Sequence, residues 1–262
     1  MRISFRSVAS LCLVASCLAA VSVPAAAQIQ KCNDTNGYVY GQYFVTAWTQ
    51  NYNGWYCRTW DGNNNDQIWY LWINLQQNST TQSAGFDAGV GRNESGGTRL
   101  TRMDDSDRIN RGMYYKFTNG LIPQNGANYY MGPKTIVSTT QFYSGLNGQY
   151  ECYIVDNSNL SPSAFANNYN LQYVSQGTYD GATYKHYSRQ LGQINQVFSI
   201  RQNYRTQGWS SVNWIQRQWV LSGLVPGSAW NLGWKINIET AGKFANGSEC
   251  GFTDLNLPWN NQ

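Results

Sequence analysis

Two glutamates lie in strand-like runs, where charged residues are uncommon. Glu151 is set into QYECYIVD, residues 149–156, and Glu239 ends WKINIE, residues 234–239, in a chain with only four glutamates. Successive side chains of a strand point to opposite faces. Each glutamate therefore shares its face with the more polar residues of its run, while the apolar residues form the other face.

Paired carboxylates of this kind can hydrolyse a glycosidic bond. One carboxylate attacks or stabilises the anomeric carbon, while the other donates and then recovers a proton. That chemistry requires both strands to lie in one curved sheet, with both carboxylates on its concave side. The alternative is that each glutamate is a surface residue paired with a nearby Lys or Arg.

The composition predicts an all-β protein. Charged residues make up 12% of the chain and aromatic residues 15%, including 11 Trp and 19 Tyr. Aromatic side chains suit a twisted antiparallel sheet, and with amide side chains they also suit sugar rings, which have apolar faces and hydroxyl rims. The predicted strands, which are short and separated by turn residues, cover 38–48, 67–75, 112–117, 150–156, 169–175, 195–204 and 234–239.

One segment has helical spacing. Residues 210–227, SSVNWIQRQWVLSGLVPG, place Ile215 and Trp219 on one face and stop at Gly223 and Pro226. The fold class we predict is therefore an all-β sandwich of antiparallel sheets with a single packed α-helix. The absence of a long polar linker predicts one domain, residues 28–262.

The N-terminus predicts export. A basic start, an apolar core and small residues before Gln28 are typical of a signal peptide over residues 1–27. The protein is then secreted, to the extracellular space or the periplasm. Four cysteines remain after cleavage, and in an exported chain they predict two disulfides of undetermined connectivity; free buried thiols are the alternative. The four are Cys32, Cys57, Cys152 and Cys250.

Other classes of function have weak support. The net charge of +4 is dispersed, which argues against nucleic-acid binding. A single histidine, His186, argues against zinc sites and a Ser–His–Asp triad, and no phosphate-binding glycine motif is present. We expect no metal, no cofactor and no membrane span. The charged run 92–111 is expected to be a solvated loop, although its DDSD at 104–107 could bind calcium.

Four motifs resemble those of glycoside hydrolase family 11, the endo-β-1,4-xylanases. YECYIVD resembles the family's nucleophile strand, and NQVFSIRQNYR (195–205) resembles its Q-Y-W-S-V-R strand. WVLSG (219–223) resembles the end of its single helix, and WKINIETAGKFANGS (234–248) resembles its acid/base strand. The motifs follow the family's order and cover roughly the second half of the mature chain.

The resemblance implies a β-jelly-roll sandwich of two antiparallel sheets with a single packed α-helix, and a role for five residues. Glu151 matches the catalytic nucleophile and Glu239 the acid/base, in a retaining, two-glutamate double displacement on xylan. Tyr153 matches a tyrosine that contacts the sugar, Arg201 an arginine close to the carboxylates, and Trp48 a sugar-stacking tryptophan. The expected partner is a polysaccharide, and we expect a monomer.

The chain also departs from the family. Its thumb region, residues 184–196, has no proline and looks shorter, and the neighbour of the acid/base has no clear counterpart, although Gly85 or Asp87 falls near it. These departures leave two alternatives open. The substrate could be another β-linked polysaccharide, a glucan or a substituted hemicellulose, or the protein could be a non-catalytic carbohydrate-binding or interaction protein on the same fold.

Overall fold

The structure is a computed structural model. It describes residues 28–31, 38–40, 43–50, 56–61, 68–75, 85–92, 101–104, 113–117, 123–140, 148–244 and 248–256. Side-chain surroundings are described for residues 102–104, 128–140, 148–237 and 239. The expected signal peptide and most of the charged run 92–111 lie outside these ranges.

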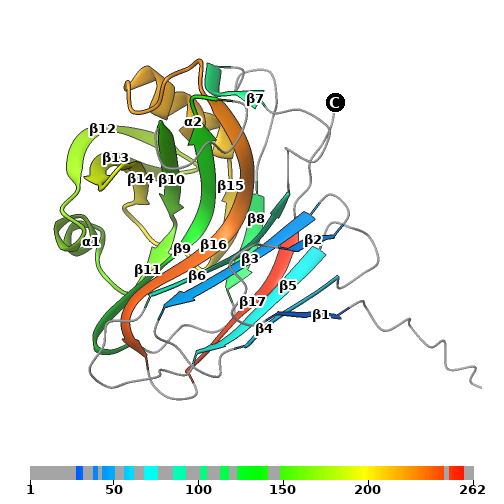
Figure 1. The fold of residues 1–262 in the computed structure, drawn as a ribbon. Coiled ribbons are helices and arrows are strands. Elements are labelled where there is room, and N and C mark those ends of the chain that lie inside the picture. Colours follow the sequence, from blue (N-terminus) through cyan, green and yellow to red (C-terminus); the bar gives the residue numbers. More distant parts are fainter. Residues whose placement is uncertain are drawn as a thin grey trace, which may run out of the picture.

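Strands dominate the described residues (Figure 1). The strands are β1 (Gln28–Lys31), β2 (Tyr38–Tyr40), β3 (Tyr43–Gln50), β4 (Tyr56–Asp61), β5 (Ile68–Leu75), β6 (Gly85–Arg92), β7 (Thr101–Arg102), β8 (Met113–Phe117), β9 (Pro123–Ser138), β10 (Gln149–Val155), β11 (Asn157–Ser158), β12 (Gln172–Tyr179), β13 (Ala182–Leu191), β14 (Ile194–Arg201), β15 (Gln207–Ser210), β16 (Trp230–Phe244) and β17 (Ser248–Asn256). The helices are α1 (Pro162–Asn168) and α2 (Val212–Leu221).

These strands form two sheets. The smaller sheet has the order β1-β4-β5-β17-β8-β15, and the larger has the order β12-β13-β14-β10-β9-β16-β6-β3-β2, with β11 and β7 added at β9 and β16. This arrangement confirms the predicted all-β jelly roll. Neighbouring strands are antiparallel except β10 and β14, which run parallel. The expectation of purely antiparallel sheets is therefore wrong at that pair.

Helix α2 confirms the one helix predicted from sequence. It begins after Ser211, whose hydroxyl accepts a hydrogen bond from the Trp214 amide, and the chain leaves it through Gly223 at φ +69°. Its Trp219 is fully buried, stacks on Trp234 at 5.9 Å between ring centroids and donates to the Ser199 hydroxyl at 2.7 Å. One face of the large sheet is thus covered by α2.

Helix α1 was not predicted, so the expected single helix is corrected to two. Ser161 caps α1 by accepting from the Ala164 amide, and Pro162 occupies the first turn, where its missing N–H costs nothing. Phe165 is fully buried. The signal Ser161-Pro162 is present in the sequence, but seven residues are too few to show helical periodicity.

Cys152 corrects the expectation of two disulfides. It is a free thiol with no exposed surface, on the face of β10 away from Glu151. Each of the three ways of pairing four cysteines requires Cys152. Cys57 and Cys250 also lie on either side of Ile73, two strand spacings apart, or about 9.5 Å. That separation exceeds the reach of a disulfide.

Gly132 lets two strands approach closely. It lies in the middle of β9 at φ +150°, and a Cβ added there would overlap the carbonyl oxygen of Ile154 in β10. Only glycine allows this approach. The close contact fixes where the chain leaves β10 for β11.

Candidate active site

Glu151 and Glu239 lie on the same face of the large sheet, with one strand between them. Glu151 is in β10 and Glu239 in β16, and both strands pair with β9. The register places Tyr153 and Lys235 opposite the same β9 residue, Lys134. Because both glutamates alternate in step with Lys134, their side chains share its face. We call this surface the glutamate face.

The two glutamates are offset along the strands. Glu151 lies opposite Ile136 of β9, whereas Glu239 lies opposite Tyr130, six positions away (136 − 130). In a flat sheet that offset is about 20 Å along the strand. Figure 1 shows that β9 and β16 are curved, so the straight-line distance between the two backbone positions is shorter than this flat-sheet value.

Glu151 is held by two neutral donors. The hydroxyl of Tyr153 donates to Glu151 Oε2 at 2.8 Å, and Gln196 Nε2 donates to the same oxygen at 2.6 Å. Gln196 is in β14, directly opposite Glu151 in the parallel pair. Its Oε1 accepts in turn from Arg189 Nε at 2.6 Å. Both donors bind Oε2, and among the described residues no side chain donates to Oε1, so that Oε1 is the oxygen placed to meet a ligand.

Glu239 is held by a cation. Lys134 Nζ lies 3.3 Å from Glu239 Oε2, and the two side chains are 6% and 26% exposed. The same ammonium lies 4.7 Å from the centre of the Tyr153 ring. A continuous chain of contacts therefore runs from Glu151 through Tyr153 and Lys134 to Glu239. The cation between the carboxylates offsets their mutual repulsion.

Tyrosines beside the carboxylates stay protonated. Burial raises the pKa of Tyr130 well above its ordinary value, and the nearby charge of Glu239 raises it further. Burial and Glu239 also raise the pKa of Tyr169, against a smaller opposite effect of Arg189. Both hydroxyls remain neutral hydrogen-bonding groups at neutral pH.

The structure places the other predicted site residues differently. Tyr153 is beside Glu151, but its ring is 2% exposed and stacks on Phe198 at 4.7 Å. Arg201 is not brought to Glu151, because it lies on the opposite face and donates to the Tyr184 hydroxyl and the Asn203 carbonyl. Trp48 is placed by its backbone only.

The backbone register identifies a neighbour for Glu239. Asp87 of β6 pairs with Glu239 on one side and with Trp48 of β3 on the other. Of the two residues considered from sequence, Gly85 and Asp87, the register therefore selects Asp87. The side chains of Trp48 and Asp87 lie outside the described residues.

Two site residues were missed by the sequence analysis. Gln196 lies inside the quoted motif 195–205, and a strand register for β10 against β14 would have revealed it, but the parallel pairing was not foreseen. Lys134 lies in a strand that was not predicted, because Gly126, Gly132 and Pro133 interrupt its alternation. Within the described part of the chain, no group of three or more His, Cys, Asp or Glu side chains is placed to hold a metal ion.

Comparisons with known proteins support the fold. No protein-family profile matches the chain, and no curated protein matches it. Among solved structures, the family 11 xylanase from Neocallimastix patriciarum superposes with a TM-score of 0.62 at 21% identity, over 88% of this chain and 97% of that one. A mutant of the ENZbleach xylanase with two introduced cysteines gives a TM-score of 0.65 at 15% identity, over 88% of this chain and 85% of that one. At these identities the likeness shows a shared fold.

Proposed function

We propose that this protein is a secreted glycoside hydrolase that cleaves a β-linked polysaccharide, with β-1,4-xylan as the first candidate, and that Glu151 and Glu239 are its catalytic carboxylates. One observation carries the proposal. On a fold shared with xylanases, the two glutamates occupy one face of one sheet, a single strand apart, and are joined by contacts through Tyr153 and Lys134.

Glu151 fits the nucleophile. Tyr153 and Gln196 both donate to Oε2 and so hold the carboxyl group in place, while no described side chain donates to Oε1, the oxygen available for attack at the anomeric carbon. In this role the Tyr153 ring does not stack on the sugar, since it is buried. We therefore assign Tyr153 to positioning Glu151.

Glu239 fits the acid/base, with one restriction. An acid must hold a proton before the glycosidic oxygen can leave, yet Lys134 favours the charged form of Glu239. The contact with Lys134 suits the second half of the reaction, when the carboxylate removes a proton from water. Substrate must therefore weaken this contact before the first half begins.

The stereochemistry of the products measures the separation of the carboxylates. Retaining enzymes have their carboxyl groups about 5–5.5 Å apart, and inverting enzymes about 6.5–9.5 Å. The resemblance predicts retention, whereas the six-position offset along β9 favours the wider spacing. Proton NMR of the first-formed anomer decides between them. A β-anomer supports the double displacement, and an α-anomer shows that the offset persists in the complex.

The decisive experiment is a panel of purified β-linked polysaccharides, with sizing of the products. We expect reducing-sugar release by the wild type, falling about 10³-fold or more in Glu151→Gln and in Glu239→Gln, since each removes a group required in the transition state. Circular dichroism should show an unchanged fold. Glu249→Gln in β17, a strand of the other sheet, is the matched control and should keep full activity.

Two results would contradict parts of this proposal. Activity close to wild type in either glutamine variant would remove that glutamate from the mechanism. Cleavage of a glucan or a substituted hemicellulose with xylan untouched would keep the chemistry and replace the substrate.

A second function, binding carbohydrate without catalysis, is favoured by one observation. Tyr153 and Lys134 are both buried, and Lys134 already forms an ion pair with Glu239, the carboxyl group that would have to hold a proton for catalysis. Calorimetry that shows oligosaccharide binding without products, unchanged in Glu151→Gln, would establish this alternative. Reducing-sugar release that this substitution abolishes would exclude it.

We also propose that the protein is exported and that its mature chain forms a single domain. Residues 1–27 are proposed to be removed, leaving residues 28–262 as a monomeric domain. Among the described residues, none of the helices is long and apolar enough to cross a membrane. N-terminal sequencing of the protein recovered from the culture medium tests the cleavage site.

A further inference from the structure

Helix α1 covers part of the glutamate face, and we call α1 together with Tyr169 at its end the cover. Tyr153 and Val155 follow Glu151 at alternate positions of β10, so their side chains share its face, and Phe198 and Ile200 of β14 pair with them. All four side chains are buried. Helix α2 cannot be the cover, since it packs on the opposite face through Trp219.

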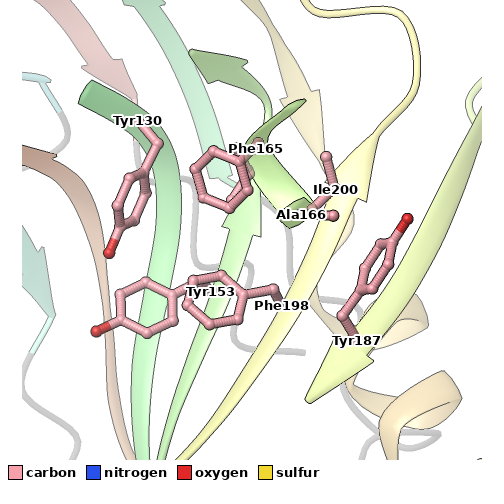
Figure 2. Close-up of a cluster of buried hydrophobic side chains, with 8 residues drawn as sticks. Tyr130, Tyr153, Phe165, Ala166, Tyr187, Phe198 and Ile200 are labelled. Carbon is pink, nitrogen blue, oxygen red and sulfur yellow. The ribbon is translucent and has the colours of Figure 1, made fainter. Parts of the chain in front are cut away.

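The cover is aromatic and closely packed (Figure 2). Phe165 of α1 lies 5.2 Å from Tyr130 and 5.9 Å from Phe198, measured between ring centroids, with edge-to-face geometry in both pairs. Tyr169, at the end of α1, lies 5.7 Å from Tyr130. Figure 2 shows Phe165 of the helix among the rings of Tyr130, Tyr153 and Phe198, and Ala166 beside Ile200.

Arg189 of β13 fastens the end of α1 to the site. Its Nη1 donates to the Tyr169 carbonyl at 3.0 Å, and its guanidinium lies 5.2 Å from the Tyr169 ring. Its Nε donates to Gln196, which itself donates to Glu151. A continuous series of hydrogen bonds therefore links the end of α1 to the candidate nucleophile Glu151.

The cover begins beside both glutamates. Tyr130 is opposite Glu239 and is 3% exposed, and Tyr153 is two residues from Glu151. Glu239 itself is partly exposed. Solvent therefore reaches the glutamates but not the sheet surface that continues from them over β10 and β14.

The neighbouring hairpin offers no loop for gripping a polymer. β13 and β14 are joined by the two-residue turn Gly192-Gln193, and Leu191 pairs directly with Ile194. The thumb region expected to be shortened is thus a tight β-turn. A turn of two residues is too short to form a loop over the glutamate face.

We propose that α1 closes one side of the substrate-binding face, so that the enzyme acts on the ends of glycan chains or on short oligosaccharides. An enzyme that cuts inside a polymer needs room for sugar units on both sides of the scissile bond. Here the surface on one side of the glutamates is filled by Phe165 and Tyr169. This inference rests on the proposed function and replaces the internal cleavage implied by the family resemblance.

The wild-type protein tests the inference directly. Soluble xylan and a series of end-labelled xylo-oligosaccharides of two to six units are digested, and the viscosity and the released reducing sugar are followed together. We expect one small product from the outset and a viscosity that falls little while reducing sugar accumulates. A rapid fall in viscosity with a mixture of product sizes would overturn the inference.

A matched pair of variants separates the cover from general destabilisation. Phe165→Ala opens the cover, whereas Ile215→Ala removes an equally buried side chain from α2 on the opposite face. We expect Phe165→Ala to increase the fall in viscosity per reducing end at least twofold, while Ile215→Ala leaves this ratio unchanged. Equal ratios in folded samples of both variants would count against the cover.

Measurements of oligosaccharide binding test the proposed closure by α1 even if the wild-type protein forms no product. Affinity for the same oligosaccharides is measured by calorimetry on Glu151→Gln, which is expected to be inactive. A closed face predicts that affinity stops rising after two or three sugar units. Affinity that rises through six units overturns the inference, and the absence of any binding overturns both it and the proposed function. Product release by the wild type separately upholds the proposed function.

Discussion

His186 is a buried titratable group outside the candidate site. Its Nδ1 lies 2.8 Å from the Ser199 hydroxyl, and its Nε2 finds no hydrogen-bond partner among the described residues. Burial lowers the pKa of His186 from 6.5 to about 4, because the charged ring would lose its hydration. The native state therefore keeps this side chain neutral.

This neutral state makes stability depend on pH. Above pH 6.5 the ring is neutral in both the folded and the unfolded chain, so it costs nothing. As the pH falls from 6.5 towards 4, only the unfolded chain gains a proton, and stability is lost. We expect His186 to account for a loss of about 2 kcal/mol between pH 7 and pH 5, out of about 3 kcal/mol in total.

Urea unfolding at pH 7 and pH 5 measures this loss. His186→Gln cannot titrate, so its stability should change less over this interval, by about 2 kcal/mol. The comparison is made within each protein, which removes the cost of the substitution itself. Identical changes in the wild type and the variant would show that His186 does not titrate during unfolding.

At the scale of single residues, alternation along the strand was enough to place the glutamates. Glu151 and Glu239 interrupt apolar runs, and the period of two assigns each to the more polar face of its own strand, while the common face follows only from the register of both strands with β9. The side chains that contact these two glutamates could not be predicted from the sequence, for a physical reason. Gln196 and Lys134 meet the glutamates across neighbouring strands, and strand neighbours are decided by the packing of the whole sheet.

Among the elements, β9 depends on one glycine. Gly132→Ala would force a methyl group into the Ile154 carbonyl and impose a strained φ of +150°. We expect a loss of about 3 kcal/mol, since the backbone of β10 cannot move aside without breaking its pairing with β14. Thermal and urea denaturation measure this loss.

Gly181 is the matched control for Gly132. It also has a positive φ, +65°, but a Cβ added there would meet no atom within 4 Å. Gly181→Ala should therefore cost only the backbone strain, about 1 kcal/mol. Equal losses in the two variants would show that the close approach of β9 to β10 does not constrain the fold.

The elements differ in how far the sequence predicted them. β5, β8, β10 and β14 alternate regularly and were placed within a few residues of their observed limits. β9 is 16 residues long but contains Gly126, Gly132 and Pro133, which normally indicate turns. β13, with its polar residues, gave no apolar alternation, and α1 was too short to show a helical period. In each case the surrounding sheet stabilises what the local sequence does not specify.

For the whole molecule, the composition predicted the fold class, whereas the order of the strands could be learned only from the structure. Aromatic and amide residues indicated an all-β protein, and two sheets are observed. The order of the strands in those sheets, in which β16 lies between β9 and β6, cannot be read from local patterns. That order brings Glu239 within one strand of Glu151.

The parallel pairing of β10 with β14 has a consequence for how the chain folds. Glu151 and Gln196, which face each other in this pair, are 45 residues apart in sequence, and β11, α1, β12 and β13 lie between them. Closing so long a loop before its contacts form is entropically costly, whereas the tight β12–β13 and β13–β14 hairpins close locally. Pulse-labelling hydrogen exchange during refolding should therefore protect amides of β13 and β14 before those amides of β10 that bond to β14, and simultaneous protection would contradict this order. The contact between Glu151 and Gln196 would then form only after the hairpins that flank it, which makes the support of the candidate nucleophile a late kinetic event.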